Sequence, residues 1–256
     1  MTFEAQNALE RSLVKAASDP AYRPQLYKDF VQSDIFILQH GRRPPEKAGQ
    51  VTLAEAATIQ ISNIEFNGKQ YIPIFSSIPR MQAALTGEAS YLGMNALEFL
   101  RITKGSALLL NPGSDYGKEI SAEEAASIVD GSFWQAAKAH VVPEATQIML
   151  GQPANYPTEL VAALTGLFKK KRQVKRAWLA HAFIPGQDQK PHTLIAIDAS
   201  DGFDEVLAEA GIVMAQDVNI PDPPVDFLPI TGGRGIEEYF TKDTKPFYER
   251  RFLGLF

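Results

Sequence analysis

The chain has 256 residues, of which 45% are hydrophobic and 21% are charged, and its formal net charge at pH 7 is −5. These values are typical of a soluble globular protein, and the mild negative charge argues against binding to nucleic acid or to an anionic membrane outside a local patch. The absence of cysteine excludes disulfides and thiolate metal sites, no apolar run is long enough to span a membrane, and we expect a cytoplasmic protein.

The first half of the chain alternates between helical and strand patterns. Apolar residues recur at helical spacing from Leu9 to Ala17, which predicts a helix that ends at Asp19-Pro20. Asn67-Gly68 lies between two strand patterns and predicts a two-residue hairpin, because both turn residues must tolerate positive φ. The other expected elements are helices at 23–32, 78–85 and 95–102, strands at 35–38, 60–66, 70–75, 91–94 and 107–110, and a loop at 40–50.

The second half has a simpler pattern, in which two helices alternate with four strands. The expected elements are strands at 146–150, 174–183, 192–198 and 225–230 and helices at 157–171 and 203–215. This β-α-β-β-α-β order predicts a ferredoxin-like sheet. We therefore assign the chain to the α+β class, with two mixed α/β domains at residues 1–136 and 137–256.

The turn expected at 185–190 sets a register for the strands on either side of it. If this turn is symmetric, His181 lies opposite His192, and Lys175 lies opposite Asp198 as a favourable charge pair. Two histidines without an evident third ligand do not predict a metal site, so we interpret them as paired surface residues.

The segment NPGSDYGKEIS, residues 111–121, is a candidate site in the first half. In one interpretation, a polar loop presents Asn111, Ser114, Asp115, Lys118 and Glu119 to a ligand or substrate. In the other, which turn residues favour, Asn-Pro-Gly forms a turn and Ser121 with Glu124 forms a capping box at the start of a helix.

The segment TGGRGIEEY, residues 231–239, is a second candidate. Its glycine N–H groups and Arg234 are suited to binding an anion. The segment lacks the Gly-Lys-Ser/Thr of a phosphate-binding loop, and a plain connection into a helix that begins near Ile236 is the preferred interpretation.

The strongest charge feature is FKKKRQVKR, residues 168–176, which contains Lys169, Lys170, Lys171 and Arg172. Cations at the end of a helix complement its macrodipole and are solvated there. The alternative is a contact site for an acidic partner. Nucleic acid is disfavoured because the flanking aromatic residues, Phe168 and Trp178, are expected to point inward and not to stack on bases.

Several segments together resemble the enhanced serine sensitivity protein B (SseB) family. They are IPIFSSIPRMQAAL and LLLNPGSDYGKEISAEE in the first half, and LTGLFKKKRQVKRAWLA, HTLIAIDA and the terminal KPFYERR in the second. The resemblance spans roughly residues 5 to 252 and implies two domains. The family name describes a phenotype, in which excess protein makes bacterial cells sensitive to serine, so it implies no reaction and no catalytic residue.

The terminal KPFYERR contains aromatic residues that a loose tail usually lacks. A short helix from Gly235 is expected to end near Asp243. We expect Phe247 and Tyr248 to dock on the second domain, with Arg250 at the surface.

The preferred hypothesis is a non-catalytic binding or regulatory protein without a cofactor or metal. It would act through a protein partner or a small anionic ligand linked to serine or sulfur amino-acid metabolism, a link that the resemblance alone implies. One alternative is an enzyme that uses Asp115, Lys118 and Glu119 for acid–base chemistry. Another is a type III secretion-associated protein, which rests on a shared name. The candidate binding residues are Asn111, Ser114, Lys118, Glu119, Lys169, Lys170, Lys171, Arg172, Arg234, Tyr248 and Arg250.

Overall fold

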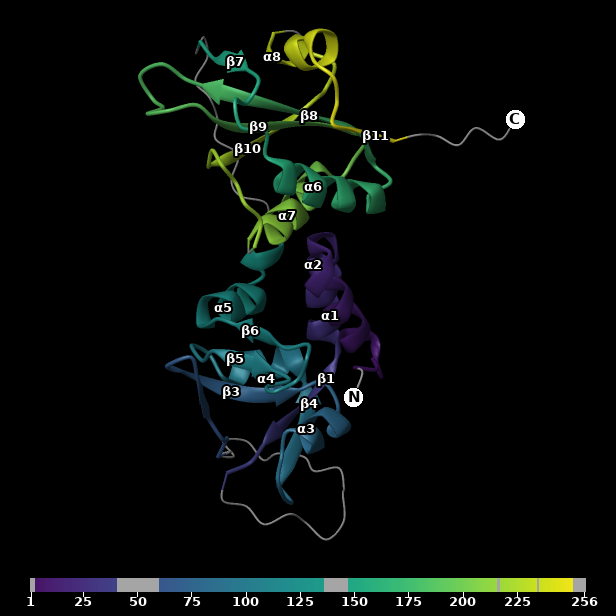
Figure 1. Cartoon of the computed structure of the whole chain (residues 1–256), viewed down its shortest axis with the longest axis vertical. Helices are drawn as coiled ribbons and strands as arrows, with labels where there is room; N and C mark the ends of the chain where they lie inside the picture. Colours follow the sequence, from purple (N-terminus) through teal and green to yellow (C-terminus); the bar gives the residue numbers. More distant parts are fainter. Residues whose placement is uncertain (1–2, 41–59, 136–146, 216, 234, 251–256) are drawn as a thin grey trace, which may run out of the picture. The chain divides into compact units, whose positions relative to one another are not determined.

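The computed structural model describes residues 3–40, 60–135, 147–215, 217–233 and 235–250 and is drawn in Figure 1. The chain divides into unit 1, residues 1–18 and 23–133, and unit 2, residues 19–22 and 134–256. The domain boundary predicted at 136/137 and the loop predicted at 40–50, apart from its first residue, lie outside the described residues. Both units combine helices with mixed or antiparallel strand pairing, so the predicted α+β class is confirmed.

Unit 1 is built on a sheet with the strand order β4-β1-β3-β5-β6, and β2 pairs with β3. β1 is antiparallel to both β3 and β4, whereas β3 and β5 run parallel. The elements are α1 (Ala8–Ser18), α2 (Arg23–Gln32), β1 (Asp34–Leu38), β2 (Ile64–Phe66), β3 (Lys69–Phe75), α3 (Ile78–Ala83), β4 (Tyr91–Asn95), α4 (Ala96–Ile102), β5 (Leu108–Leu110), β6 (Lys118–Ile120), α5 (Ala122–Asp130) and η2 (Ser132–Trp134).

Local sequence signals account for several of these elements. Asn67 and Gly68 adopt φ of 51° and 75° between β2 and β3, which confirms the predicted hairpin. Ser121 and Glu124 form the predicted capping box at the start of α5. The strand β6 was not expected, because three residues, two of them charged, carry no strand pattern. It exists because it pairs with β5.

Unit 2 contains η1 (Pro20–Tyr22), β7 (Met149–Gly151), α6 (Thr158–Lys170), β8 (Val174–Phe183), β9 (His192–Ala199), α7 (Phe203–Met214), β10 (Val225–Pro229), α8 (Ile236–Glu238), the π-helical turn η3 (Tyr239–Asp243) and β11 (Tyr248–Glu249). The predicted chain order β-α-β-β-α-β is present. The sheet order is β10-β9-β8-β11, and β7 also pairs with β8. The ferredoxin-like arrangement is not confirmed, because β7 lies beside β8 and is not inserted next to β10.

The sheet of unit 2 is covered on both faces, with α6 and α7 on one side and α8 on the other (Figure 1). Ala177 and Leu179 of β8 pack toward the first side, whereas Trp178 and Ala180 pack toward the second, with Phe240 of η3. This alternation follows from the two-residue period of a strand. Among the described helices, none is long and apolar enough to cross a membrane.

The register between β8 and β9 differs from the predicted one by one residue. His192 lies opposite Ala182, and Asp198 lies opposite Arg176. An irregularity between Val174 and Arg176 then places Lys175 outside the regular ladder. The predicted Lys175–Asp198 pair is therefore wrong, and Arg176 pairs with Asp198 instead, with 3.0 Å between Nη2 and Oδ2.

Candidate functional site

Asn111, the first residue of the candidate segment in unit 1, is part of a buried polar cluster. Its side chain is bonded to Ser76: the Ser76 N–H donates to Asn111 Oδ1 at 2.9 Å, and Asn111 Nδ2 donates to Ser76 Oγ at 2.9 Å. Asn111 is 1% exposed and has a φ of 51°. Ser114 is half-buried, and its N–H donates to the Asn111 carbonyl at 3.2 Å. Asn111 thus connects the ends of β3 and β5.

Glu10 of α1 is the charged member of this cluster, and its side chain is fully buried. Its Oε1 accepts hydrogen bonds from the hydroxyls of Ser76 at 2.8 Å and Ser77 at 2.9 Å. Its Oε2 accepts from Arg80 Nη2 at 3.2 Å and from the Gln6 N–H at 2.9 Å. Burial raises the pKa of Glu10, but these donors outweigh burial and hold the pKa below its usual value.

Our sequence reasoning missed Glu10, although the sequence carries a signal for it. Leu13, Val14 and Ala17 follow Glu10 at intervals of three, four and seven residues, so its carboxylate lies on the apolar stripe of α1. A carboxylate on such a stripe needs internal donors. Because the side-chain donors Ser76, Ser77 and Arg80 are distant in sequence, sequence alone does not identify them.

Lys118 and Glu119 are neighbours on β6 and therefore point to opposite faces of the sheet. Lys118 Nζ lies 3.8 Å from Glu124 Oε1, and the hydroxyl of Tyr27 also donates to Glu124. Glu119 accepts a hydrogen bond from Tyr71 at 2.7 Å. Burial and the charge of Glu124 raise the pKa of Tyr27, which keeps its phenol neutral.

The acid–base cluster considered from the sequence is not assembled in unit 1. Asp115 is exposed, and Lys118 and Glu119 lie on opposite faces with separate partners. Lys118 and Glu119 therefore do not face a common point.

The glycine-rich segment of unit 2, residues 231–239, binds the carboxylate of Glu237 through its backbone N–H groups. The N–H groups of Thr231, Gly232 and Gly233 donate to Glu237 Oε2 at 2.8–2.9 Å. Burial raises the pKa of Glu237, but these bonds and the Thr231 hydroxyl outweigh burial, and the pKa is lowered. Arg234 lies outside the described residues. The segment therefore has the donors predicted for an anion, and a carboxylate occupies them.

The basic run divides into cations that are engaged within unit 2 and cations that are not. Lys171 lies between Glu205 and Glu209, with Nζ–Oε1 distances of 2.8 and 2.6 Å. Lys170 lies 3.3 Å from Asp19 Oδ2 and 3.9 Å from the centre of the Tyr22 ring. The charges of Lys170 and Lys171 are therefore matched by carboxylates of their own unit.

Lys169, Arg172 and Lys175 are exposed, as is Lys170, but unlike Lys170 they lie outside the described ion pairs, and we call these three the basic surface. Within the described part of the chain, none of the three has an ion pair or a side-chain hydrogen bond. Phe168 and Trp178, which flank the run, are 0% and 1% exposed, as expected for inward-facing residues. Neither of these two rings is exposed beside the basic surface, and the half-buried ring of Tyr22 is in contact with Lys170.

The C-terminal tail docks on unit 2, as predicted. Tyr248 is 6% exposed and belongs with Phe168 to the core beneath α6, and Phe247 packs against the same core. The tail also forms the unexpected strand β11, which pairs with β8 at Ala177 and Arg176. Burial of Tyr248 in this core explains why the C-terminal segment contains aromatic residues.

Arg250 binds carbonyl groups and no carboxylate in the described residues. Its Nη2 donates to the carbonyl oxygens of Phe168 at 3.0 Å and of Lys171, and its Nε donates to that of Val174 at 3.1 Å. Its backbone N–H donates to the Lys175 carbonyl at 2.8 Å. The guanidinium therefore caps the C-terminal end of α6 and holds the turn that leads into β8.

The two histidines of the hairpin are not a surface pair. The side chains of His181 and His192 are 15% and 8% exposed and lie on opposite faces of the sheet. His181 Nε2 lies 3.2 Å from Asp222, and His192 lies between Asp188 on Nδ1 and Asp226 on Nε2. In the described part of the chain, no group of three or more His, Asp or Glu residues is placed to hold a metal ion.

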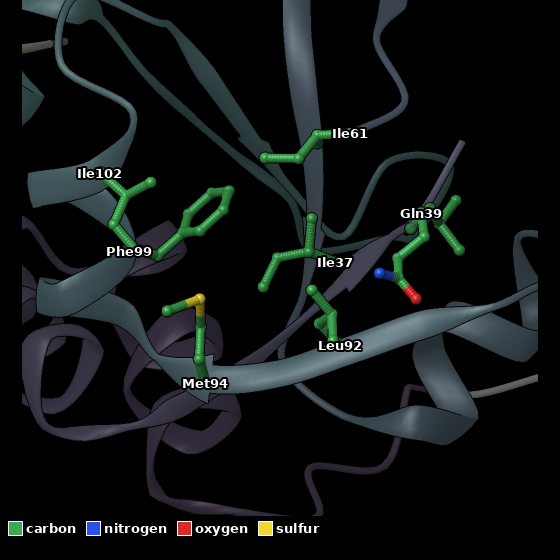
Figure 2. Close-up of a pocket in the computed structure, with 8 residues that line it drawn as sticks. Ile37, Gln39, Ile61, Leu92, Met94, Phe99 and Ile102 are labelled. Atoms are coloured by element: carbon green, nitrogen blue, oxygen red, sulfur yellow. The ribbon is translucent and has the colours of Figure 1, made fainter. Parts of the chain in front are cut away.

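Unit 1 also has a small apolar pocket, shown in Figure 2. Ile37 of β1, Leu92 and Met94 of β4, and Phe99 and Ile102 of α4 line it, together with Leu38, Gln39 and Ile61. None of the residues predicted as a site lines this pocket.

Two family models match the chain. The model described as the SseB protein N-terminal domain matches residues 9–127, and the model described as the SseB protein C-terminal domain matches residues 142–250. Curated proteins named Protein SseB from Escherichia coli (strain K12) and Shigella flexneri are each 28% identical over 253 residues, covering 98% of this chain and 95% of the relative. No solved structure gives a significant match.

Proposed function

Because the chain belongs to the SseB family and carries both of its domains, we propose that it is a non-catalytic protein that acts by binding a protein partner. The observation that carries this proposal is the contrast between the basic surface and the other candidate groups. Asn111, Lys118, Glu119 and Tyr248 each bind another residue of the fold, whereas Lys169, Arg172 and Lys175 are exposed cations.

A protein partner is favoured over a small anion because of the state of the glycine-rich segment. The backbone donors that would suit a small anion are bonded to Glu237, so a ligand would have to displace this carboxylate. The basic surface is open, and exposed charges at an interface guide association and select partners.

We place the protein in the bacterial cytoplasm and its partner in serine or sulfur amino-acid metabolism. The support for this pathway is the family name, which describes sensitivity to serine. In this role the protein would change the amount or activity of its partner and carry out no reaction itself.

Affinity purification from bacterial lysate tests the proposal. The full chain, tagged and expressed at its native level, is the bait, and an unrelated protein of similar size and net charge is the control bait. We expect mass spectrometry to find a protein enriched with the chain and absent from the control. Recovery of no enriched protein, together with a metabolite that raises the melting temperature of the chain, would overturn the protein-binding proposal.

A further inference from the structure

We infer that the basic surface, Lys169, Arg172 and Lys175, is the docking site for an acidic segment of a protein. This inference rests on the proposed function and specifies the chemistry of the partner. It goes beyond that function because it selects three cations from the run and assigns the others to the fold.

The first argument is the distribution of charge. Lys171 is matched by Glu205 and Glu209, Lys170 by Asp19, and Arg176 by Asp198. The three cations of the basic surface lie within residues 169–175 and are left without an acidic neighbour among the described ion pairs. In a chain of net charge −5, this is a local reversal of sign that attracts an acidic segment.

The second argument concerns the end of α6, where the last carbonyl groups carry partial negative charge that repels an anion. Arg250 donates to the carbonyl oxygens of Phe168 and Lys171 at this end and to that of Val174 in the following turn. Its guanidinium thereby offsets the negative end of the helix dipole. An approaching carboxylate therefore meets the cationic side chains and carbonyl groups whose partial negative charge is offset by Arg250.

The third argument is that the backbone of the surface is ordered by the fold. The Arg250 N–H binds the carbonyl of Lys175, at the irregularity where Lys175 leaves the regular ladder and becomes exposed. Such irregularities re-aim a side chain. A surface whose backbone is already fixed loses less conformational entropy when a partner binds.

The chemistry of the surroundings selects a protein segment over a nucleic acid. Proteins that hold single strands stack bases on exposed aromatic rings, and the two aromatic residues that flank the run, Phe168 and Trp178, are buried. The half-buried ring of Tyr22 is covered by Lys170, with Nζ 3.9 Å from the ring centre. The surface therefore offers mainly charge, which suits the carboxylates of an Asp- and Glu-rich segment.

The test measures fluorescence anisotropy with a labelled peptide of alternating Glu and Gly residues. We expect the wild-type chain to bind this peptide and to show no detectable binding to the peptide in which Gln replaces Glu. The variant Lys169→Glu/Arg172→Glu/Lys175→Glu is expected to bind at least about tenfold more weakly, because three attractive charges become repulsive. The neutral variant Lys169→Gln/Arg172→Gln/Lys175→Gln serves if charge reversal disturbs folding.

The matched control is Lys104→Glu/Lys190→Glu/Lys245→Glu, which makes the same change in net charge at exposed positions outside the surface. We expect it to weaken binding by less than about threefold, because none of these three lysines belongs to the basic surface. Equal loss of affinity in both variants, or unchanged affinity in the first, would overturn the inference. So would tighter binding of single-stranded oligothymidylate, or of phosphatidylcholine–phosphatidylglycerol vesicles, through the same three residues.

The same variants separate this inference from the proposed function. The lysate experiment can be repeated with the variant Lys169→Glu/Arg172→Glu/Lys175→Glu. If the wild type and this variant recover the same partner, the proposed protein binding is supported and the docking site lies elsewhere. If the wild type binds the Glu–Gly peptide through these residues but recovers no protein, the surface has the inferred chemistry and the proposed function fails.

Discussion

The phenolic hydroxyl of Tyr248 donates a hydrogen bond to the carbonyl oxygen of Phe168 at 3.0 Å, across 80 residues of sequence. Their rings also lie 5.7 Å apart between centroids. The C-terminal tail is therefore attached to the end of α6 by an apolar and by a polar contact, next to the basic surface. This attachment makes the tail part of the fold of unit 2.

Substitution of Tyr248 separates these two contacts. Tyr248→Phe is expected to lower the free energy of unfolding by only about 1 kcal/mol, since the Phe168 carbonyl keeps its bond from Arg250. Tyr248→Ala is expected to lower it by about 3–5 kcal/mol, as large-to-small changes in cores do. Urea unfolding of both variants measures the difference, and equal effects would contradict the docked tail.

Arg250 tests the cap at the end of α6. Arg250→Ala is expected to lower the free energy of unfolding by about 1–3 kcal/mol, because buried carbonyl groups lose their donor. Arg250→Lys is expected to recover only part of this loss, since an ammonium group does not reproduce the planar fork of a guanidinium. Arg172→Ala, at an exposed position of the same turn, is the control and should change stability by no more than about 0.5 kcal/mol.

Glu10 makes the stability of unit 1 depend on pH. Its folded-state pKa lies below its usual value, which is about 4.3 in an unfolded chain. Its stabilising effect is therefore complete above that value and is lost as the pH falls through the folded-state pKa. We expect Glu10→Gln to lower stability at pH 7 by about 1–3 kcal/mol and to flatten the acid limb of the stability profile. An unchanged acid limb in urea titrations would contradict the role of Glu10.

Substitution of the adjacent residues Lys171 and Lys170 is expected to lower the free energy of unfolding by different amounts. Burial lowers the pKa of Lys171, but Glu205 and Glu209 raise it more, so the net shift is upward. Its contribution is present below about pH 10.4, the unfolded value, and is lost as the pH rises through the folded-state pKa. Lys171→Met is expected to lower the free energy of unfolding by up to about 3 kcal/mol, because the buried carboxylate of Glu209 loses its ion pair with Lys171.

Lys170→Met is the matched control for Lys171. The side chains of Lys170 and Asp19 are 34% and 41% exposed, so loss of their ion pair should cost no more than about 1 kcal/mol. Thermal unfolding of both variants at pH 7 compares them. A larger loss for Lys170→Met would show that burial of the carboxylate does not set the cost.

Local chemistry made part of the fold predictable. The Asn67-Gly68 hairpin and the Ser121–Glu124 capping box depend on residues within one turn of each other, and both form as expected. β6, β11 and the sheet order of unit 2 depend on pairing between distant segments, which the pattern of a single segment does not contain. The one-residue register error at Asp198 has the same origin, because symmetry of the 185–190 turn does not determine it.

The candidate sites were predictable as segments but not as contacts. The sequence located the basic run but did not show which of its cations are paired. In the structure, Lys170 pairs with Asp19, and Lys171 pairs with Glu205 and Glu209. Lys169 and Arg172 are not among the described ion pairs. The glycine-rich segment was identified as a possible anion site, and its partner, Glu237, lies four to six residues away on the following helix. In both cases the missing information was which carboxylate lies nearby.

The outer side of β8 is shared between two short strands, β7 at one end and β11 at the other. Between them the side chain of Gln152 donates to the Leu179 carbonyl at 3.3 Å. A long strand with open backbone groups is a template for aggregation, and this division leaves β8 little continuous backbone for a foreign strand. Residues 247–250 thus cover the β8 backbone at Lys175 and Ala177, and proteolytic loss of the tail would expose this backbone to a neighbouring molecule.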